Sequence, residues 1–155
     1  MTYSNTMLLP QVGSSYGFGI RHLILPRVFR KDSVSTIKLN LRSEDIRKCH
    51  DKLNRIEALG DNWNGYGAVP ISKELVKEAK RITKALRMIP QVYPTADGTL
   101  QFEYEKKDGS YLEISLSDSE TVGVFEISKD KTEKEYQIEK TVSAIDGIVK
   151  NFYGF

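Results

Sequence analysis

Cysteine and histidine are scarce in this sequence of 155 residues. There is one cysteine, Cys49, and there are two histidines, His22 and His50. One cysteine cannot form an internal disulfide, and three such side chains are too few for a four-ligand structural zinc site. The longest apolar runs, such as residues 23–25, are far shorter than the roughly 20 residues that cross a bilayer. The composition therefore predicts a protein of the reducing cytoplasm with no disulfide, zinc site or membrane segment.

Charge is also missing at the start of the chain, where the first 20 residues include no charged side chain. A secretory signal begins with a basic region, so export is not expected. The later charges are uneven: residues 1–42 contain six Lys or Arg and one acidic residue, whereas residues 43–155 contain 17 basic and 20 acidic residues. With 39% hydrophobic and 28% charged residues, the chain has the composition of a folded soluble protein with one core.

Residues 1–42 lack a sustained helical or strand period. They are interrupted by Pro10, Gly13, Gly17, Gly19 and Pro26. We interpret them as an extended basic arm. Within this arm Ile37, Leu39 and Leu41 alternate with polar residues, which favours one short strand. We expect residues 43–155 to form a single α+β domain.

Two amphipathic helices are expected at the start of this domain. The first should begin after Ser43, an N-cap residue followed by two acids, and apolar residues recur at spacings of three and four as far as Leu59. The second should follow Pro70 and Ser72 and end before Pro90. Joined by a compact loop, these helices would form a hairpin.

The period changes to two after Pro90. Residues 100–105 and 112–116 alternate apolar and polar side chains, and further strands are expected at 122–127 and around 136–138. Apolar residues between Val142 and Phe152 predict a final helix. The predicted class is α+β: a helical hairpin on an antiparallel meander of three to four strands, with a C-terminal helix.

The first two of these strands permit a prediction of register. Their apolar residues share one face only if the loop between them has three residues, 107–109, with its glycine in the left-handed conformation. That register sets Glu103 directly opposite Glu113 on the polar face, and Glu105 opposite Tyr111. Like charges that face each other are unfavourable by up to about 1 kcal/mol, so we expect a compensating interaction.

Two interpretations of these carboxylates remain open. In one, Glu103 and Glu113, with Glu105 or Asp97, present a cluster to a metal ion or to a basic partner. In the other, neighbouring Lys or Arg side chains neutralise a solvated face. Spacing supplies no paired nucleophile and no third ligand, so we predict no catalytic residue, no metal and no cofactor.

The loop DNWNGYGA, residues 61–68, concentrates unusual residue types. It contains the only tryptophan, Trp63, together with Tyr66, two glycines and three Asp or Asn side chains. Such residues suit a ligand pocket, but they also suit a sharp turn that an aromatic side chain fixes to the core. We favour the structural interpretation and keep Trp63 and Tyr66 as candidate binding residues.

The same loop, with the segment PTADG and the strands QFEYE and YLEISL, resembles a widespread family of small bacterial proteins. In that family an Asp-x-Trp-Asp-Gly-Tyr-Gly-Ala motif precedes Pro-x-x-Asp-Gly and a strand containing Leu-Glu-Ile. The likeness covers residues 45–127. It implies an accessory gene of a bacterial chromosome or mobile element, and no particular activity. The chain departs from the pattern at Asn64, where an acid is commoner, and at Tyr104, where Trp is commoner.

The basic arm allows two further interpretations. Its residues Arg21, Arg27, Arg30 and Lys31 are interleaved with aromatic side chains, which suits phosphate contacts and base stacking. We favour the second interpretation, in which the arm docks on the acidic sheet face of its own chain or on another subunit.

Taken together, these features predict a non-catalytic protein-interaction module of the antitoxin-like or anti-defence regulator type. Its partner would be another protein or a second copy. A nucleic-acid-binding protein and a metal-dependent hydrolase are the alternatives.

Overall fold

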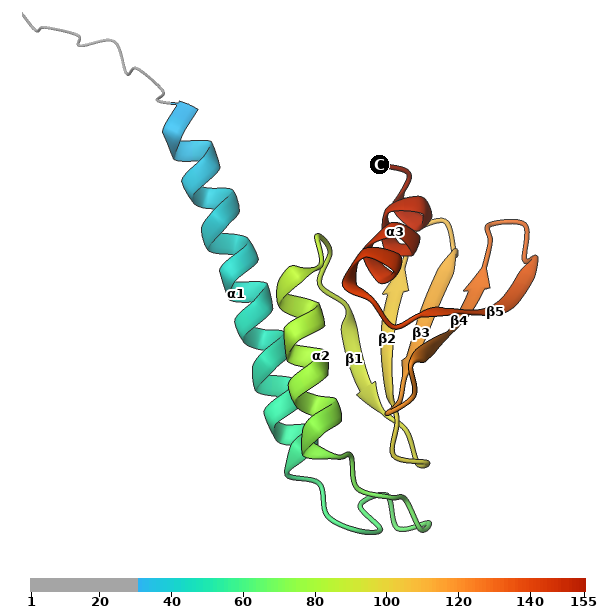
Figure 1. The fold of residues 1–155 in the computed structure, drawn as a ribbon. Helices are drawn as coiled ribbons and strands as arrows, with labels where there is room; N and C mark the ends of the chain where they lie inside the picture. The colour runs from blue at the N-terminus through green and yellow to red at the C-terminus, as the bar shows by residue number, and fades with distance from the viewer. Residues whose placement is uncertain (1–30) are drawn as a thin grey trace, which may run out of the picture. The chain divides into compact units, whose positions relative to one another are not determined.

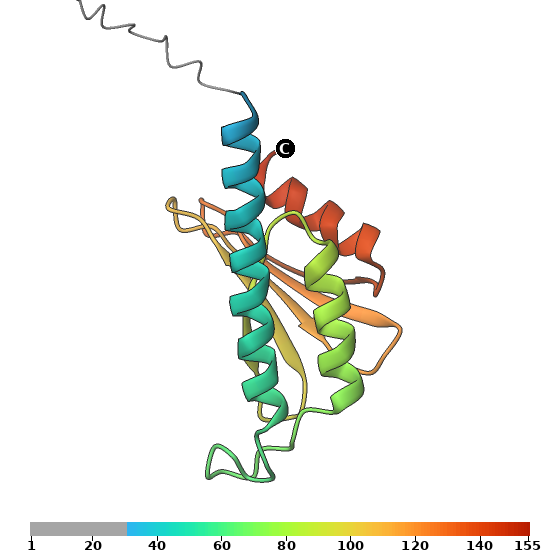
Figure 2. The same cartoon turned by 90° about the vertical axis from the view of Figure 1, so that its left-hand side faces the viewer.

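The computed structural model describes residues 31–155. Three helices and five strands follow in the order α1 (Lys31–Glu57), α2 (Lys73–Ala85), β1 (Gln91–Pro94), β2 (Leu100–Glu105), β3 (Tyr111–Leu116), β4 (Thr121–Ile127), β5 (Glu133–Glu139) and α3 (Val142–Tyr153). The predicted α+β class is confirmed: α1 and α2 lie side by side, and α3 follows the sheet (Figures 1 and 2). Within the described residues, no helix is both long and apolar enough to cross a membrane.

The sheet is an antiparallel meander of five strands in chain order, rather than the three to four strands expected. The additional strand is β1, which is four residues long and ends at Pro94. Proline cannot donate a backbone hydrogen bond and is therefore confined to edge strands or strand ends. Because β1 lies at the edge of the sheet, its proline is tolerated there.

One core lies between the helices and one face of the sheet. Phe102, Ile114 and Val124 from three neighbouring strands form a single cluster with Leu53 of α1, and the cluster continues into α2 and α3. Both views show the three helices on the same side of the sheet (Figures 1 and 2). The second face of the sheet therefore carries the side chains that alternate with the buried ones.

The predicted register of the first hairpin is confirmed. Glu103 pairs with Glu113, and Glu105 pairs with Tyr111. Two backbone hydrogen bonds close the loop. The Lys106 amide donates to the Ser110 carbonyl and the Gly109 amide donates to the Lys106 carbonyl, each at 3.0 Å. Gly109 has φ +81°, as a type I turn followed by a bulge requires.

The strand expected near residues 36–42 is wrong, and so is the helix start after Ser43. Helix α1 already begins at Lys31, so the part of the predicted extended arm from residue 31 to 42 is helical. Ile37, Leu39 and Leu41 are 57–66% exposed, and a three-residue alternation without a partner strand does not outweigh propagation of an adjacent helix. The Ser43 hydroxyl donates to the Leu39 carbonyl at 2.9 Å, which is the bond of a serine inside a helix.

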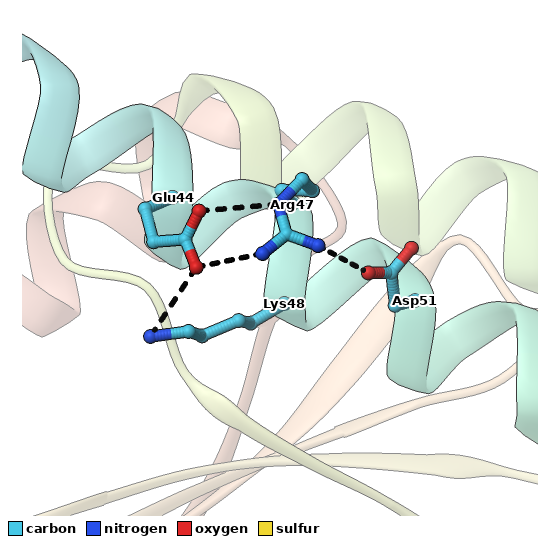
Figure 3. A network of polar contacts seen from close by, with 4 residues as sticks. All are labelled: Glu44, Arg47, Lys48 and Asp51. Carbon is cyan, nitrogen blue, oxygen red and sulfur yellow. Dashed lines mark hydrogen bonds and ion pairs between the residues drawn. The ribbon is translucent and has the colours of Figure 1, made fainter.

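Glu44, one of the two acids that suggested a helix start, instead belongs to a polar network along α1 (Figure 3). Arg47 donates to Glu44 at 2.7 Å and to Asp51 at 3.1 Å, and the Lys48 ammonium lies 3.6 Å from Glu44. These spacings of three and four residues lie on one helix surface. The hydrogen bond from Arg47 is the main cause that lowers the pKa of Glu44 below its ordinary value.

Candidate binding surface on the open sheet face

The face of the sheet away from the helices is here called the open face. In β2 to β5 it consists of Gln101, Glu103, Glu105, Tyr111, Glu113, Ser115, Thr121, Gly123, Phe125, Ile127, Glu133, Glu135, Gln137 and Glu139. Six of these positions are glutamate and none is Lys or Arg. The open face is therefore the acidic side of the domain.

Two adjacent rows of paired residues run across the strands on the open face. One row runs Glu103, Glu113, Phe125 and Glu135. The next runs Glu105, Tyr111, Ile127 and Glu133. Tyr111, Phe125 and Ile127, here called the apolar trio, are all half-buried. The open face therefore has an apolar centre bordered by carboxylates.

Glu113 is held by neutral donors from its own face. The Gln101 amide donates to its Oε1 at 2.8 Å, the Ser115 hydroxyl donates to the same oxygen at 3.2 Å, and the Tyr111 hydroxyl donates to Oε2 at 3.1 Å. Burial raises the pKa of Tyr111, and the nearby Glu103 and Glu113 raise it further, so this hydroxyl remains a donor. These donors supply the compensation that the opposed glutamates require.

Lys52 of α1 lies close enough to Glu103 for their charges to interact. Burial lowers the pKa of Lys52, and the charge of Glu103 opposes that shift. The Lys52 ammonium also lies 3.6 Å from the ring centroid of Tyr93 on the edge strand β1, which is within range of a cation–π interaction. The neutralising charge predicted for the acidic face therefore comes partly from a helix of the domain itself.

A metal site is not assembled in the described residues. Both oxygens of Glu113 already accept hydrogen bonds, and in residues 31–155 no group of three or more His, Cys, Asp or Glu could hold a metal ion. Asp97 accepts from the Thr95 and Thr99 hydroxyls. It therefore shapes the turn before β2, as the Pro-x-x-Asp-Gly pattern indicates.

The loop of residues 61–68 is folded by its two asparagines. The Asn64 side-chain oxygen accepts from the Tyr66 amide at 2.8 Å and from the Ala68 amide at 3.2 Å. The Asn62 side-chain oxygen accepts from the Gly67 amide at 2.6 Å. Gly65 and Gly67 have φ +76° and +85°, a backbone conformation that residues with a Cβ rarely adopt.

The aromatic residues of this loop do not enter the core. Trp63 is half-buried and donates its indole N–H to the Val69 carbonyl at 3.3 Å. Tyr66 is 93% exposed. Buried Ala68 and a 2.8 Å bond from the Val69 amide to the Ala96 carbonyl attach the loop to the rest of the domain. The loop is thus a structural turn that leaves one tyrosine free for contacts.

Cys49 and His50 serve the packing of α1 on α2. Burial raises the pKa of the Cys49 thiol, so it stays in the unreactive protonated form. The His50 Nε2 lies 3.2 Å from the Thr83 hydroxyl. Both side chains therefore interact with Thr83 of α2.

Of the basic candidates, Arg21, Arg27 and Arg30 lie outside the described residues. Lys31 is the first residue of α1. Sequence reasoning missed the apolar trio's members Phe125 and Ile127. Both parities of residues 122–127 are largely apolar, so the pattern could not show which face is buried.

Comparisons with known proteins gave no match among family models, curated proteins or solved structures. The resemblance to the small bacterial proteins therefore stays a prediction.

Proposed function

We propose that the protein is a non-catalytic interaction module that binds another protein through the open face. The observation that carries the proposal is the apolar trio, surrounded by glutamates on a sheet face that no helix of residues 31–155 covers. Protein interfaces typically combine an apolar centre with a polar rim. The open face has this arrangement within two adjacent rows of the sheet.

The glutamates around the apolar trio indicate the charge of the partner surface. Six glutamates, with no Lys or Arg among the strand residues of the open face and only Lys52 of α1 near Glu103, favour a partner surface that is rich in Lys and Arg and has an apolar centre. A second copy that used the same face would bring like charges together in a two-fold interface. A different protein therefore fits the open face better than a second copy.

The biological role proposed for this contact is that of an antitoxin-like or anti-defence regulator in a bacterium or mobile element. The resemblance to small bacterial accessory proteins supports this role. An acidic face also suits it, because proteins that act on nucleic acids present basic surfaces to phosphate, and an acidic module can cover them. On the open face neither alternative function has comparable support, because its glutamates repel phosphate and both oxygens of Glu113 already accept hydrogen bonds.

The proposal is tested by site-specific photo-crosslinking of the full chain in its host cells. A benzophenone amino acid replaces Phe125 in the apolar trio, or exposed Lys77 on α2 as a control. We expect one adduct of defined mass from position 125 and none from position 77. The adduct should disappear in Glu133→Lys/Glu135→Lys and persist in the matched variant Asp61→Lys/Glu120→Lys, which changes exposed acids elsewhere.

Absence of an adduct from position 125 would refute the proposal, as would an adduct that survives reversal of Glu133 and Glu135. An adduct twice the mass of the chain would show self-association and refute the choice of partner.

A further inference from the structure

A groove of about 870 Å³ lies between α1 and the chain entering β1. Its α1 wall extends from Lys38 to Arg55, and its other wall and floor are formed by residues 87–92. The volume is at the upper end of the range for ligand sites. We call it the α1 groove.

The α1 groove is basic. Its lining contains the cations Lys38, Arg42, Lys48, Lys52, Arg55 and Arg87, and one acid, Asp45. Arg42 donates to the Lys84 and Leu86 carbonyls at 3.1 and 3.0 Å, so no carboxylate neutralises its charge there. Lys38 and Arg55 are exposed and form no ion pair with residues 34–155.

The two exposed cations stand at opposite ends of the groove. They are 17 residues apart on one helix, which corresponds to about 25 Å at a rise of 1.5 Å per residue. A small anion cannot reach both. An extended peptide of about seven or eight residues can, because each residue spans at most 3.3–3.6 Å.

The floor of the groove indicates which kind of polyanion fits. Leu41 and Met88 are 61% and 37% exposed, and the buried residues Pro90 and Val92 also line the groove. No aromatic ring is among the lining residues, so bases would find no platform for stacking. Aliphatic side chains of a peptide would cover Leu41 and Met88 from water.

We propose that the α1 groove binds an acidic peptide segment of a partner protein, with carboxylates toward Lys38 and Arg55 and aliphatic side chains on Leu41 and Met88. Residues 1–30 of the chain are not that segment, because they contain three arginines and no Asp or Glu. The α1 groove differs from the open face in its lining and is opposite to it in charge, although Lys52 lies near both. The proposal therefore does not depend on the function proposed above.

The test is selection of random 12-residue peptides, displayed on phage, against the immobilised full chain. We expect enriched sequences that combine two or more acids with two aliphatic residues. Synthetic versions should bind Lys38→Glu/Arg55→Glu about tenfold more weakly than the native chain, because two favourable charge contacts become repulsive. The control Lys73→Glu/Lys77→Glu changes two exposed lysines of α2 by the same charge and should leave affinity unchanged.

A second pair of variants tests the floor. Leu41→Ser and Met88→Ser replace exposed side chains, so folding should be retained, and each should weaken binding severalfold. The proposal is overturned if no acidic sequence is enriched, if the enriched peptides bind Lys38→Glu/Arg55→Glu as tightly as the native chain, or if the control weakens binding equally. Tighter binding of a random 12-nucleotide pool, lost in the same groove variant, would overturn it in favour of nucleic acid. Binding to the open face is untouched by these variants, so the two proposals can fail separately.

Discussion

Replacing Asn64 by alanine should unfold the loop of residues 61–68 at a measurable cost. The side-chain oxygen accepts from two backbone amides, and each such bond stabilises a protein by about 0.5–1.5 kcal/mol. Since Asn64 is half-buried and water replaces part of the loss, we expect Asn64→Ala to lower the free energy of unfolding by about 1–2 kcal/mol. In a chain of this size that corresponds to a fall in Tm of about 3–6 °C.

Asn64→Asp is the matched control, because a carboxylate offers the same acceptor at the same place. Its free energy of unfolding should lie within about 0.5 kcal/mol of the native value. Urea unfolding followed by circular dichroism at 222 nm measures global stability, while the fluorescence of Trp63 reports on the loop itself. The reasoning is refuted if Asn64→Ala is as stable as the native chain. It is also refuted if Asn64→Asp loses as much as Asn64→Ala, since the amide nitrogen would then be the group that matters.

Three further predictions concern the turns, the core and acid stability. Gly98 and Gly109 have φ +85° and +81°. An added Cβ at Gly98 would lie 3.4 Å from the Pro70 carbonyl oxygen, whereas at Gly109 it would meet only the movable Lys131 ammonium. Thermal unfolding should therefore show that Gly98→Ala loses more stability than Gly109→Ala, which should lose about 1 kcal/mol. Leu53 is fully buried and Leu39 is 66% exposed, so urea titrations should show a loss of about 2–5 kcal/mol for Leu53→Ala and almost none for Leu39→Ala. Burial opposes ionisation of Asp146, but hydrogen bonds from Lys150 and the Arg87 amide leave its pKa below the ordinary value. Its stabilisation should therefore be present above about pH 5 and disappear as pH falls through the lowered pKa, so unfolding curves of the native chain and Asp146→Asn should differ above about pH 5 and converge below about pH 3.

The strands were predictable because their signals are local. Alternation in β2 and β3, together with the turn residues between them, determines the register without reference to the rest of the fold. The N-terminal half of α1 was not predictable in the same way. Val34, Ile37 and Leu41 are exposed, so no buried stripe marks this part of the helix, and its helicity depends on continuation from the packed segment after Cys49.

The candidate site was predictable only in part. The pattern placed Glu103 opposite Glu113, but the donors that stabilise Glu113 depend on the rotamers of Gln101, Tyr111 and Ser115, which no spacing encodes. The α1 groove could not be predicted from the sequence either. Two of its cations, Lys38 and Arg42, were assigned to an extended arm. Residues 87–92 on its other wall are brought near α1 only by the packing of α1 beside β1.

The function of Asn64 bears on the resemblance to small bacterial proteins. The sequence departs from that family at this position, where an acid is commoner. In the structure the side chain serves as an acceptor for two amides, a task that Asp and Asn perform equally. A turn-forming position such as 64 can therefore hold either Asp or Asn.

The chain-order meander has a consequence for how the domain acquires its structure. Each strand pairs only with the next one along the chain, through connections of four or five residues. Such short loops cost little entropy to close, so strand pairing should proceed rapidly, one hairpin after another, as the chain is synthesised. Ile145 and Val149, which are fully buried, belong to the last helix. The growing chain therefore exposes part of its future core until α3 leaves the ribosome, and that interval is when it is most open to aggregation.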